Sequence, residues 1–170
     1  MTLRAIVGLG SSLARGEAVL ANAVAEIARI PCVSLVSTSD IVRTAAFGGR
    51  ALAPFFNAAC VVETTLSPSA LLAALHAVER RFGRVRVKKD APRTLDLDVL
   101  LVDHHLARAS SSSSGAPRVP HPGLSSRASA LFPAREAWAR ATHARAPFEL
   151  SARVSRRGIV SRVDDGATTA

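Results

Sequence analysis

The sequence is poor in aromatic and sulfur-containing residues. Its 170 residues include no tyrosine, one tryptophan, one methionine and two cysteines, and only 4% are aromatic. Two cysteines are too few for the disulfide framework of a small secreted protein, so we expect Cys32 and Cys60 to be buried free thiols. The scarcity of aromatic residues also argues against a sheet that stacks RNA bases.

Long apolar runs are missing as well. No segment approaches the ~18 consecutive apolar residues of a membrane-spanning helix, and the N-terminal residues lack the layout of a signal peptide. We therefore expect a cytoplasmic protein. Because 48% of the residues are hydrophobic, the chain can form one folded domain, which we place at residues 1–150, before a polar, frayed tail over 151–170.

Basic residues outnumber acidic ones by 22 to 13, which gives a formal net charge of +9 at pH 7. Such an excess suits a polyanionic ligand, either a nucleotide or a nucleic acid. An arginine-rich composition explains the scattered arginines near the C-terminus but not the cluster in one central segment. That cluster consists of Arg80, Arg81, Arg84, Arg86, Lys88, Lys89 and Arg93.

The spacing of apolar residues predicts alternating strands and helices. Strand-like runs cover residues 3–9, 32–44 and 55–65, with a fourth around Asp96 and Asp98, and helical spacing covers 16–29, 67–82 and 128–141. The serine tract at 109–115 is typical of a hairpin tip or an insertion. This order predicts an α/β, ferredoxin-like fold in which helices pack on the faces of an antiparallel sheet.

Two carboxylates lie two residues apart inside an apolar run. On a strand, Asp96 and Asp98 would point to the same face, while Leu95, Leu97 and Val99 would face the core. Adjacent carboxylates repel, so a site that holds both ionised usually places a cation between them. The exposed face of an edge strand would explain the pair equally well. The neighbouring basic cluster favours a site for hard cations and nucleotide phosphates.

Several further segments share a family-like order and spacing over roughly residues 3–140. They are Gly8-Leu9-Gly10-Ser11-Ser12-Leu13, Arg43-Thr44, Phe55-Phe56-Asn57-Ala58-Ala59, Glu79, Gly83-Arg84-Val85-Arg86, Pro92-Arg93-Thr94-Leu95-Asp96-Leu97-Asp98, and Val119-Pro120-His121-Pro122 followed by Arg127. In this combination the chain resembles the 6-hydroxymethyl-7,8-dihydropterin pyrophosphokinase family of folate biosynthesis. The resemblance implies transfer of a pyrophosphoryl group from ATP to the pterin, with release of AMP.

The resemblance also implies a role for each matching residue. Asp96 and Asp98 would hold two Mg²⁺ ions, and Arg84 and Arg93 would join them as catalytic residues that neutralise the phosphates. The residues implied in ATP binding are Glu79, Arg86, Arg93, Arg118, His121 and Arg127. Those implied in pterin binding are Thr44, Phe47, Phe55 and Asn57. The partners would be the pterin and ATP, with no nucleic acid and no membrane, and the chain would be a monomer.

Taken singly, most of these residues also have a purely structural explanation. Glu79 could pair with a basic neighbour on a solvated helix end, and His121, before a proline, could be a turn residue. Asn57 could lie at a strand edge and Phe55 in an ordinary core. Only the order and spacing that these residues share with the family favours a functional role for all of them.

The chain departs from the family pattern mainly around the pterin. Asp90 stands where the family has an aromatic in its mobile loop, and Ser129 stands where it has a second stacking phenylalanine. Phe132 or Phe47 would then supply the second ring. The arginine that the family has before the Val-Pro-His motif is replaced by Ala116, and Arg118 follows two positions later. Residues two apart on a strand share a face, so Arg118 would serve the phosphates instead.

Two alternatives to the enzyme follow from the same residues. A degenerate family member would bind the nucleotide without turnover, as the changes at Asp90 and Ser129 suggest. A ferredoxin-like RNA-binding module would fit the charge, but paired aspartates amid a basic face would repel a phosphate backbone unless a metal intervened.

Overall fold

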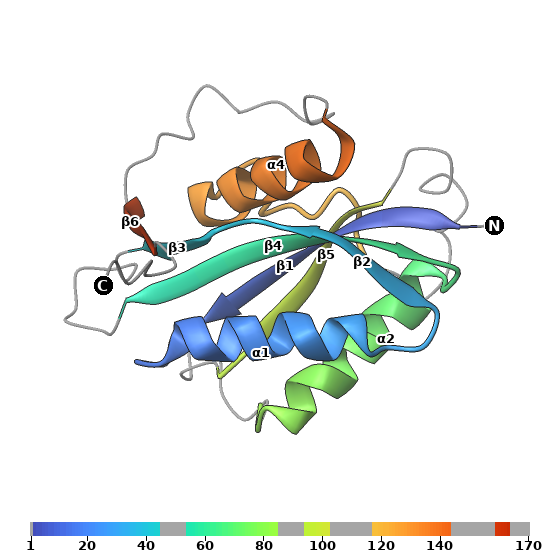
Figure 1. Ribbon diagram of the computed structural model, residues 1–170, viewed down its shortest axis with the longest axis horizontal. Helices are drawn as coiled ribbons and strands as arrows, with labels where there is room; N and C mark the ends of the chain where they lie inside the picture. The colour runs from blue at the N-terminus through green and yellow to red at the C-terminus, as the bar shows by residue number, and fades with distance from the viewer. Residues whose placement is uncertain (1, 45–53, 85–93, 103–116, 144–158, 164–170) are drawn as a thin grey trace, which may run out of the picture.

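The computed structural model describes residues 2–44, 54–84, 94–102, 117–143 and, for the backbone, 159–163. Its strands form one antiparallel sheet, and its helices pack on both faces of that sheet (Figure 1). The elements are β1 (Leu3–Ser11), α1 (Gly16–Ala28), β2 (Val33–Thr38), β3 (Ile41–Thr44), β4 (Phe55–Thr64), α2 (Pro68–Arg81), β5 (Asp96–Val102), α4 (Ala128–Thr142) and β6 (Ile159–Val163).

The order of the strands confirms the predicted fold class. The sheet runs β5-β1-β4-β3-β6, with β2 also paired to β4, and every recorded pair is antiparallel. The first and last strands of the strand–helix–strand–strand–helix–strand unit, β1 and β5, lie side by side, as in a ferredoxin-like sheet. Helices α1 and α2 cover one face, and α4 crosses the other (Figure 1).

The residues at both ends of α2 are of types that favour helix ends. The Ser67 hydroxyl accepts the N–H of Ala70 at 3.2 Å, and Pro68 occupies the first helical turn, where no N–H is needed. Gly83 follows the helix with φ +73°, a conformation that glycine adopts without steric cost. The helix therefore ends in time for Arg84 to turn back toward β5.

The alternation of side chains along the strands produces two separate cores. On β1, Leu3, Ala5, Val7 and Leu9 pack with the helices α1 and α2. Ile6 points the other way and packs under α4. On β4 the same division separates the even-numbered residues from the odd-numbered ones. Because both faces carry a core at this level, the sheet is buried on both sides near its middle.

Three predictions about the chain need correction. The run over 32–44 is two strands, β2 and β3, because an irregularity separates them at Ser39 and Asp40. Cys32 is exposed, in a turn with φ +64°, whereas only Cys60 is buried as expected. Residues 159–163 of the tail pair with β3 as β6 and are not frayed.

Two predicted features lie wholly or largely outside the described residues. The serine tract at 109–115 and most of the basic cluster, including Arg86, Lys88, Lys89 and Arg93, fall outside them. Among the helices that the structure describes, none has the length and apolarity to cross a membrane.

The two thiols should react very differently. Burial raises the pKa of Cys60 to about 12, so almost no thiolate forms there at neutral or mildly alkaline pH. Cys32 is exposed. We expect one thiol to react rapidly with a chromogenic disulfide reagent in the folded chain and both after denaturation. A Cys32→Ser variant should show no rapid reaction, and rapid labelling of that variant would contradict the buried position of Cys60.

Candidate active site

The face of the sheet that carries α4 changes character along β1. The packed cluster beneath α4 includes Ile6, and the next two positions on this face are Gly8 and Gly10. A Cβ atom on Gly10 would lie 3.6 Å from Oδ1 of Asn57 and 3.8 Å from Cβ of Asp96. Gly10 therefore forms a floor without side chains between polar residues of β4 and β5. This role could not be predicted from the sequence, in which Gly8 and Gly10 indicated only the end of a strand.

Asp96 and Asp98 leave β5 on this same face, as predicted. They lie opposite Gly10 and Gly8 of β1, and both are partly exposed, whereas Leu97 between them is buried in the opposite core. The alternation is interrupted at Leu100, since Val7 pairs with Val99 but Ile6 with Leu101. This bulge lets consecutive leucines close the core under α4 beyond the two carboxylates.

Arg84 links Asp96 to a buried glutamate. Its Nη1 donates to Oδ1 of Asp96 at 2.5 Å and also to Oε1 of Glu79. Glu79 is only 1% exposed, and the same Oε1 accepts the backbone N–H of Leu97 at 2.8 Å. One carboxylate thus fixes the outer edge of β5 and aims a guanidinium at the aspartates. The structural explanation for Glu79 was therefore wrong, because it required a side chain on a solvated helix end and this carboxylate is buried.

A second polar group lies on the same face, on β4 and β3. Nδ2 of Asn57 donates to Oγ1 of Thr44 at 3.1 Å, and that hydroxyl lies 3.4 Å from the carbonyl oxygen of Phe55, to which it donates. Phe55 is partly exposed and lies two residues before Asn57, so both point to this face. Three residues predicted to bind the pterin are thereby brought together beside Gly10.

His121 and Arg127 meet at the turn that leads into α4. The backbone N–H of His121 donates to the carbonyl oxygen of Leu100 at 2.8 Å, two residues beyond Asp98. Nδ1 of His121 accepts the N–H of Gly123 at 3.0 Å. A Cβ atom on buried Gly123 would lie 3.1 Å from the imidazole and 3.5 Å from Cδ of Arg127. Gly123 was not predicted as a site residue. Because it has no side chain, those of His121 and Arg127 can both lie close to it.

Arg118 does not lie on a strand, and several other predicted residues are not described by the structure. Arg118 is exposed and lies in an irregular segment, so the argument that placed it on a strand face was wrong. Arg86, Arg93, Phe47 and Asp90 lie outside the described residues.

The source of a second aromatic ring stays a prediction. On α4 the buried positions Leu131, Ala134 and Ala137 define the side that packs on the sheet. Phe132 lies one turn before Glu136, whose carboxylate accepts the backbone N–H of Asp40 between β2 and β3, so it leaves the helix on the side nearest β3. Ser129 and Phe132 are both partly exposed. Phe132 and Phe47 both stay predicted sources of a second ring.

The donor atoms on β5 suit magnesium. Mg²⁺ takes oxygen ligands and is commonly bound by one or two carboxylates together with substrate phosphates. Asp96 and Asp98 supply two carboxylates on one face. In the part of the chain that the structure describes, no three His, Cys, Asp or Glu side chains gather into a metal site. Two carboxylates on one face fit an ion that also takes phosphate oxygens as ligands.

Comparison with known proteins gives a consistent family. A family model described as 7,8-dihydro-6-hydroxymethylpterin-pyrophosphokinase matches residues 6–139. A curated protein of Pseudomonas aeruginosa, named 2-amino-4-hydroxy-6-hydroxymethyldihydropteridine pyrophosphokinase, is 36% identical over 135 residues, which cover 78% of this chain and 79% of the relative. The chain belongs to this family.

Two other relatives with the same printed name differ in coverage. The Methylorubrum extorquens protein is 39% identical over 57% of this chain, and the Synechocystis protein is 35% identical over 78% of it. The chain spans only 61% and 65% of their lengths. In a crystal structure with pterin and p-hydroxybenzoate, Plasmodium falciparum HPPK-DHPS matches with a TM-score of 0.46 and 13% identity over 60% of this chain and 28% of that chain, a likeness too weak to carry an argument.

Replacing Glu79 should destabilise the fold through the β5 edge. Glu79→Ala leaves the N–H of Leu97 and one side of Arg84 without their acceptor, and we expect the free energy of unfolding to fall by about 3 kcal/mol. Glu79→Gln, which keeps an acceptor for Leu97, should lose less. Urea denaturation followed by circular dichroism measures both.

Glu63→Ala is the matched control for that measurement. Glu63 pairs with Arg4 at 2.5 Å, but the two side chains are 38% and 32% exposed. An exposed pair of this kind contributes less than about 1 kcal/mol. Equal losses for Glu79→Ala and Glu63→Ala would show that Glu79 does not hold the edge of β5.

Proposed function

We propose that this chain, as a member of the family, transfers a pyrophosphoryl group from ATP to the hydroxymethyl oxygen of 6-hydroxymethyl-7,8-dihydropterin and releases AMP. One observation carries the proposal: a carboxylate pair with an attached arginine and an asparagine–threonine pair lie on the same side of one sheet, with Gly10 between them. The first group suits the triphosphate and the second suits the edge of a heterocycle. The nucleotide and the pterin would therefore meet over Gly10.

On the phosphate side, Asp96 and Asp98 would hold Mg²⁺. When bound, two such ions supply positive charge to the attacking and leaving oxygens of the displacement. Arg84 would add a guanidinium beside the transferring phosphates, in a position already fixed by Glu79. We assign Glu79 this positioning role in place of the direct ATP contact that the family resemblance implied, because its carboxylate is buried and already accepts two donors. Arg93 and Arg86 would supply further charge.

His121 and Arg127 would bind the rest of the nucleotide. Because Nδ1 of His121 accepts the N–H of Gly123, the neutral ring carries its proton on Nε2 and can donate it to a phosphate oxygen. Arg127 is exposed at the start of α4, where the positive end of the helix dipole also favours an anion. Arg118 would add charge from the same segment.

On the pterin side, Asn57 would bind the amide edge of the ring. One hydrogen of Nδ2 is used by Thr44, and Oδ1 lies above Gly10, so the carboxamide is held with its acceptor toward the centre of the site. Thr44 is 8% exposed and fixes this orientation. Phe55 would stack on one side of the ring and Phe47 or Phe132 on the other. Orienting both substrates in this way converts a bimolecular reaction into one within a complex.

The two alternative functions gain no support from the fold or the family. A base-stacking sheet needs exposed aromatic residues, and on the described part of this face only Phe55 was identified as a candidate. The member without turnover rests on the changes at Asp90 and Ser129, and neither the fold nor the family favours it over an enzyme in which Arg84 is paired with Asp96. We propose that the chain acts in the cytoplasm, as a monomer, on these two small molecules.

Removing either carboxylate should abolish the reaction. We expect Asp96→Asn and Asp98→Asn each to lower pterin-dependent AMP formation by at least about 10²-fold, since each change removes charge stabilisation from the transition state. Separating AMP from ATP by chromatography, with and without the pterin, measures this rate. Glu17→Gln, an exposed change in the first turn of α1, should leave it unchanged. Wild-type turnover by either aspartate variant, or no AMP from the wild-type chain, would contradict the proposal.

A further inference from the structure

The junction between β2 and β3 contains one extra residue. Ser37 faces α4, because its hydroxyl donates to the carbonyl oxygen of Ala137 at 2.6 Å. Ile41 packs against the core on the opposite face. Residues four apart on an uninterrupted strand share a face. The register agrees. Thr38 pairs with Cys60 and Val42 with Asn57, so between these two pairs the chain advances four residues from β2 to β3 but only three along β4.

This extra residue decides which side chains of β3 enter the candidate site. A one-residue slip in a strand moves every side chain to the other face of the sheet. With the slip, Thr44 shares the face of Asn57 and bonds to it. Without it, Arg43 would point to that face and Thr44 would point away. Bulges next to active sites commonly re-aim side chains in this manner.

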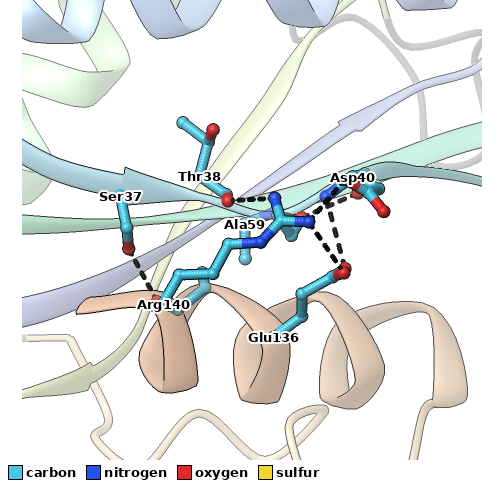
Figure 2. A network of polar contacts seen from close by, with 8 residues as sticks. Ser37, Thr38, Asp40, Ala59, Glu136 and Arg140 are labelled. Atoms are coloured by element: carbon cyan, nitrogen blue, oxygen red, sulfur yellow. Dashed lines mark hydrogen bonds and ion pairs between the residues drawn. The ribbon is translucent and has the colours of Figure 1, made fainter. Parts of the chain in front are cut away.

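Two sets of contacts hold the junction. Ser39 keeps the junction hydrogen-bonded to β4. Its N–H donates to the carbonyl oxygen of Ala59 at 2.8 Å, and its hydroxyl accepts the N–H of Ala59 at 2.9 Å. The second set comes from α4 (Figure 2). Nη1 of Arg140 donates to the carbonyl oxygen of Thr38 at 2.8 Å, and Nη2 donates to Oδ1 of Asp40 at 2.7 Å. The guanidinium thereby connects the two sides of the junction.

Glu136 completes this second set. Its Oε1 accepts from Nη2 of Arg140 at 3.1 Å, and its Oε2 accepts the backbone N–H of Asp40 at 3.2 Å (Figure 2). The hydrogen bond with Asp40 raises the pKa of Arg140 above its ordinary value, so the guanidinium stays charged. Arg140 is 45% exposed and Asp40 35%, and exposed ion pairs add little to global stability. A network of this kind fixes local geometry more than it stabilises the fold.

We propose that Arg140, Asp40 and Glu136 form a clamp that positions β3 and thereby aims Thr44, and through it Asn57, at the pterin. Arg140 is in this sense a positioning residue for the pterin half of the site alone, because it contacts the β2–β3 junction, whereas Arg84 contacts β5 at the opposite edge of the sheet. The proposal rests on the proposed function, because it assigns the clamp to that reaction's acceptor substrate.

Steady-state kinetics of Arg140→Met tests the clamp, because methionine keeps much of the apolar stem and removes the charged fork. We expect the KM for the pterin to rise about 5- to 10-fold, the effect of weakening one neutral hydrogen bond. The KM for ATP and kcat should stay within about twofold of the wild type, and Arg140→Lys, which keeps the charge without the fork, should lie between. Equal increases in both KM values, or an unchanged KM for the pterin, would overturn the proposal.

Arg4→Met is the matched control. Arg4 is also part of a partly exposed ion pair between residues far apart in sequence, and it lies at the opposite end of β1 from Gly10. It should lose similar stability without changing either KM. An equal rise in the KM for the pterin in Arg4→Met would mean that general destabilisation, not the clamp, causes the effect.

A measurement on the ligand-free chain separates this proposal from the proposed function. In heteronuclear NMR spectra, the side-chain amide signals of Asn57 should shift in Arg140→Met and stay in place in Arg4→Met. Unshifted signals in Arg140→Met would refute the clamp whether or not the wild-type chain forms AMP. A shift together with a wild-type chain that forms no AMP would support the clamp and refute only the enzymatic function.

Discussion

The candidate site depends on the facing of side chains in one antiparallel sheet. Asp96, Gly10, Asn57 and Thr44 come from four adjacent strands, and they form one surface only because each leaves its strand on the same side. Side chains alternate with a period of two, so a slip of one residue in any strand would remove its contribution. The alternation of side chains is interrupted on both sides of the candidate site. One extra residue is Leu100, beyond the two carboxylates, and another lies between β2 and β3, before Thr44. Packing on both faces then fixes this register, because every slip would also turn leucines and valines out of the two cores.

Electrostatics at the edge of β5 follows from the same register. The N–H of Leu97 points away from β1, and Glu79 accepts it from the end of α2. That carboxylate also holds Arg84, which reaches Asp96, so acidic and basic groups of the site are organised in the protein itself. A charge arrangement that is fixed before the substrate binds does not have to reorganise during the reaction. A buried glutamate thereby organises the charged groups of the candidate site before any ligand is bound.

Much of the fold and part of the site could be predicted from the sequence. The helices and the shared face of Asp96 and Asp98 follow from local patterns, namely helical spacing, the Ser67 cap and alternation along a strand. The junction at Ser39 and Asp40 could not be predicted, because a bulge depends on contacts with Ala59 and α4 that are distant in sequence. Glu79 looked like a surface residue for the same reason, since its partner Leu97 lies 18 residues away. The only local hint at the bulge was the loose alternation over 32–44.

A crystal structure of the chain with Mg²⁺, a non-hydrolysable ATP analogue and 6-hydroxymethyl-7,8-dihydropterin would test the central claim most directly. We expect the triphosphate beside Asp96 and Asp98 and the pterin beside Asn57 and Thr44, with the hydroxymethyl oxygen and the β-phosphorus meeting over Gly10. Ligands bound on the face covered by α1 and α2, or a pterin that does not contact Asn57, would contradict it.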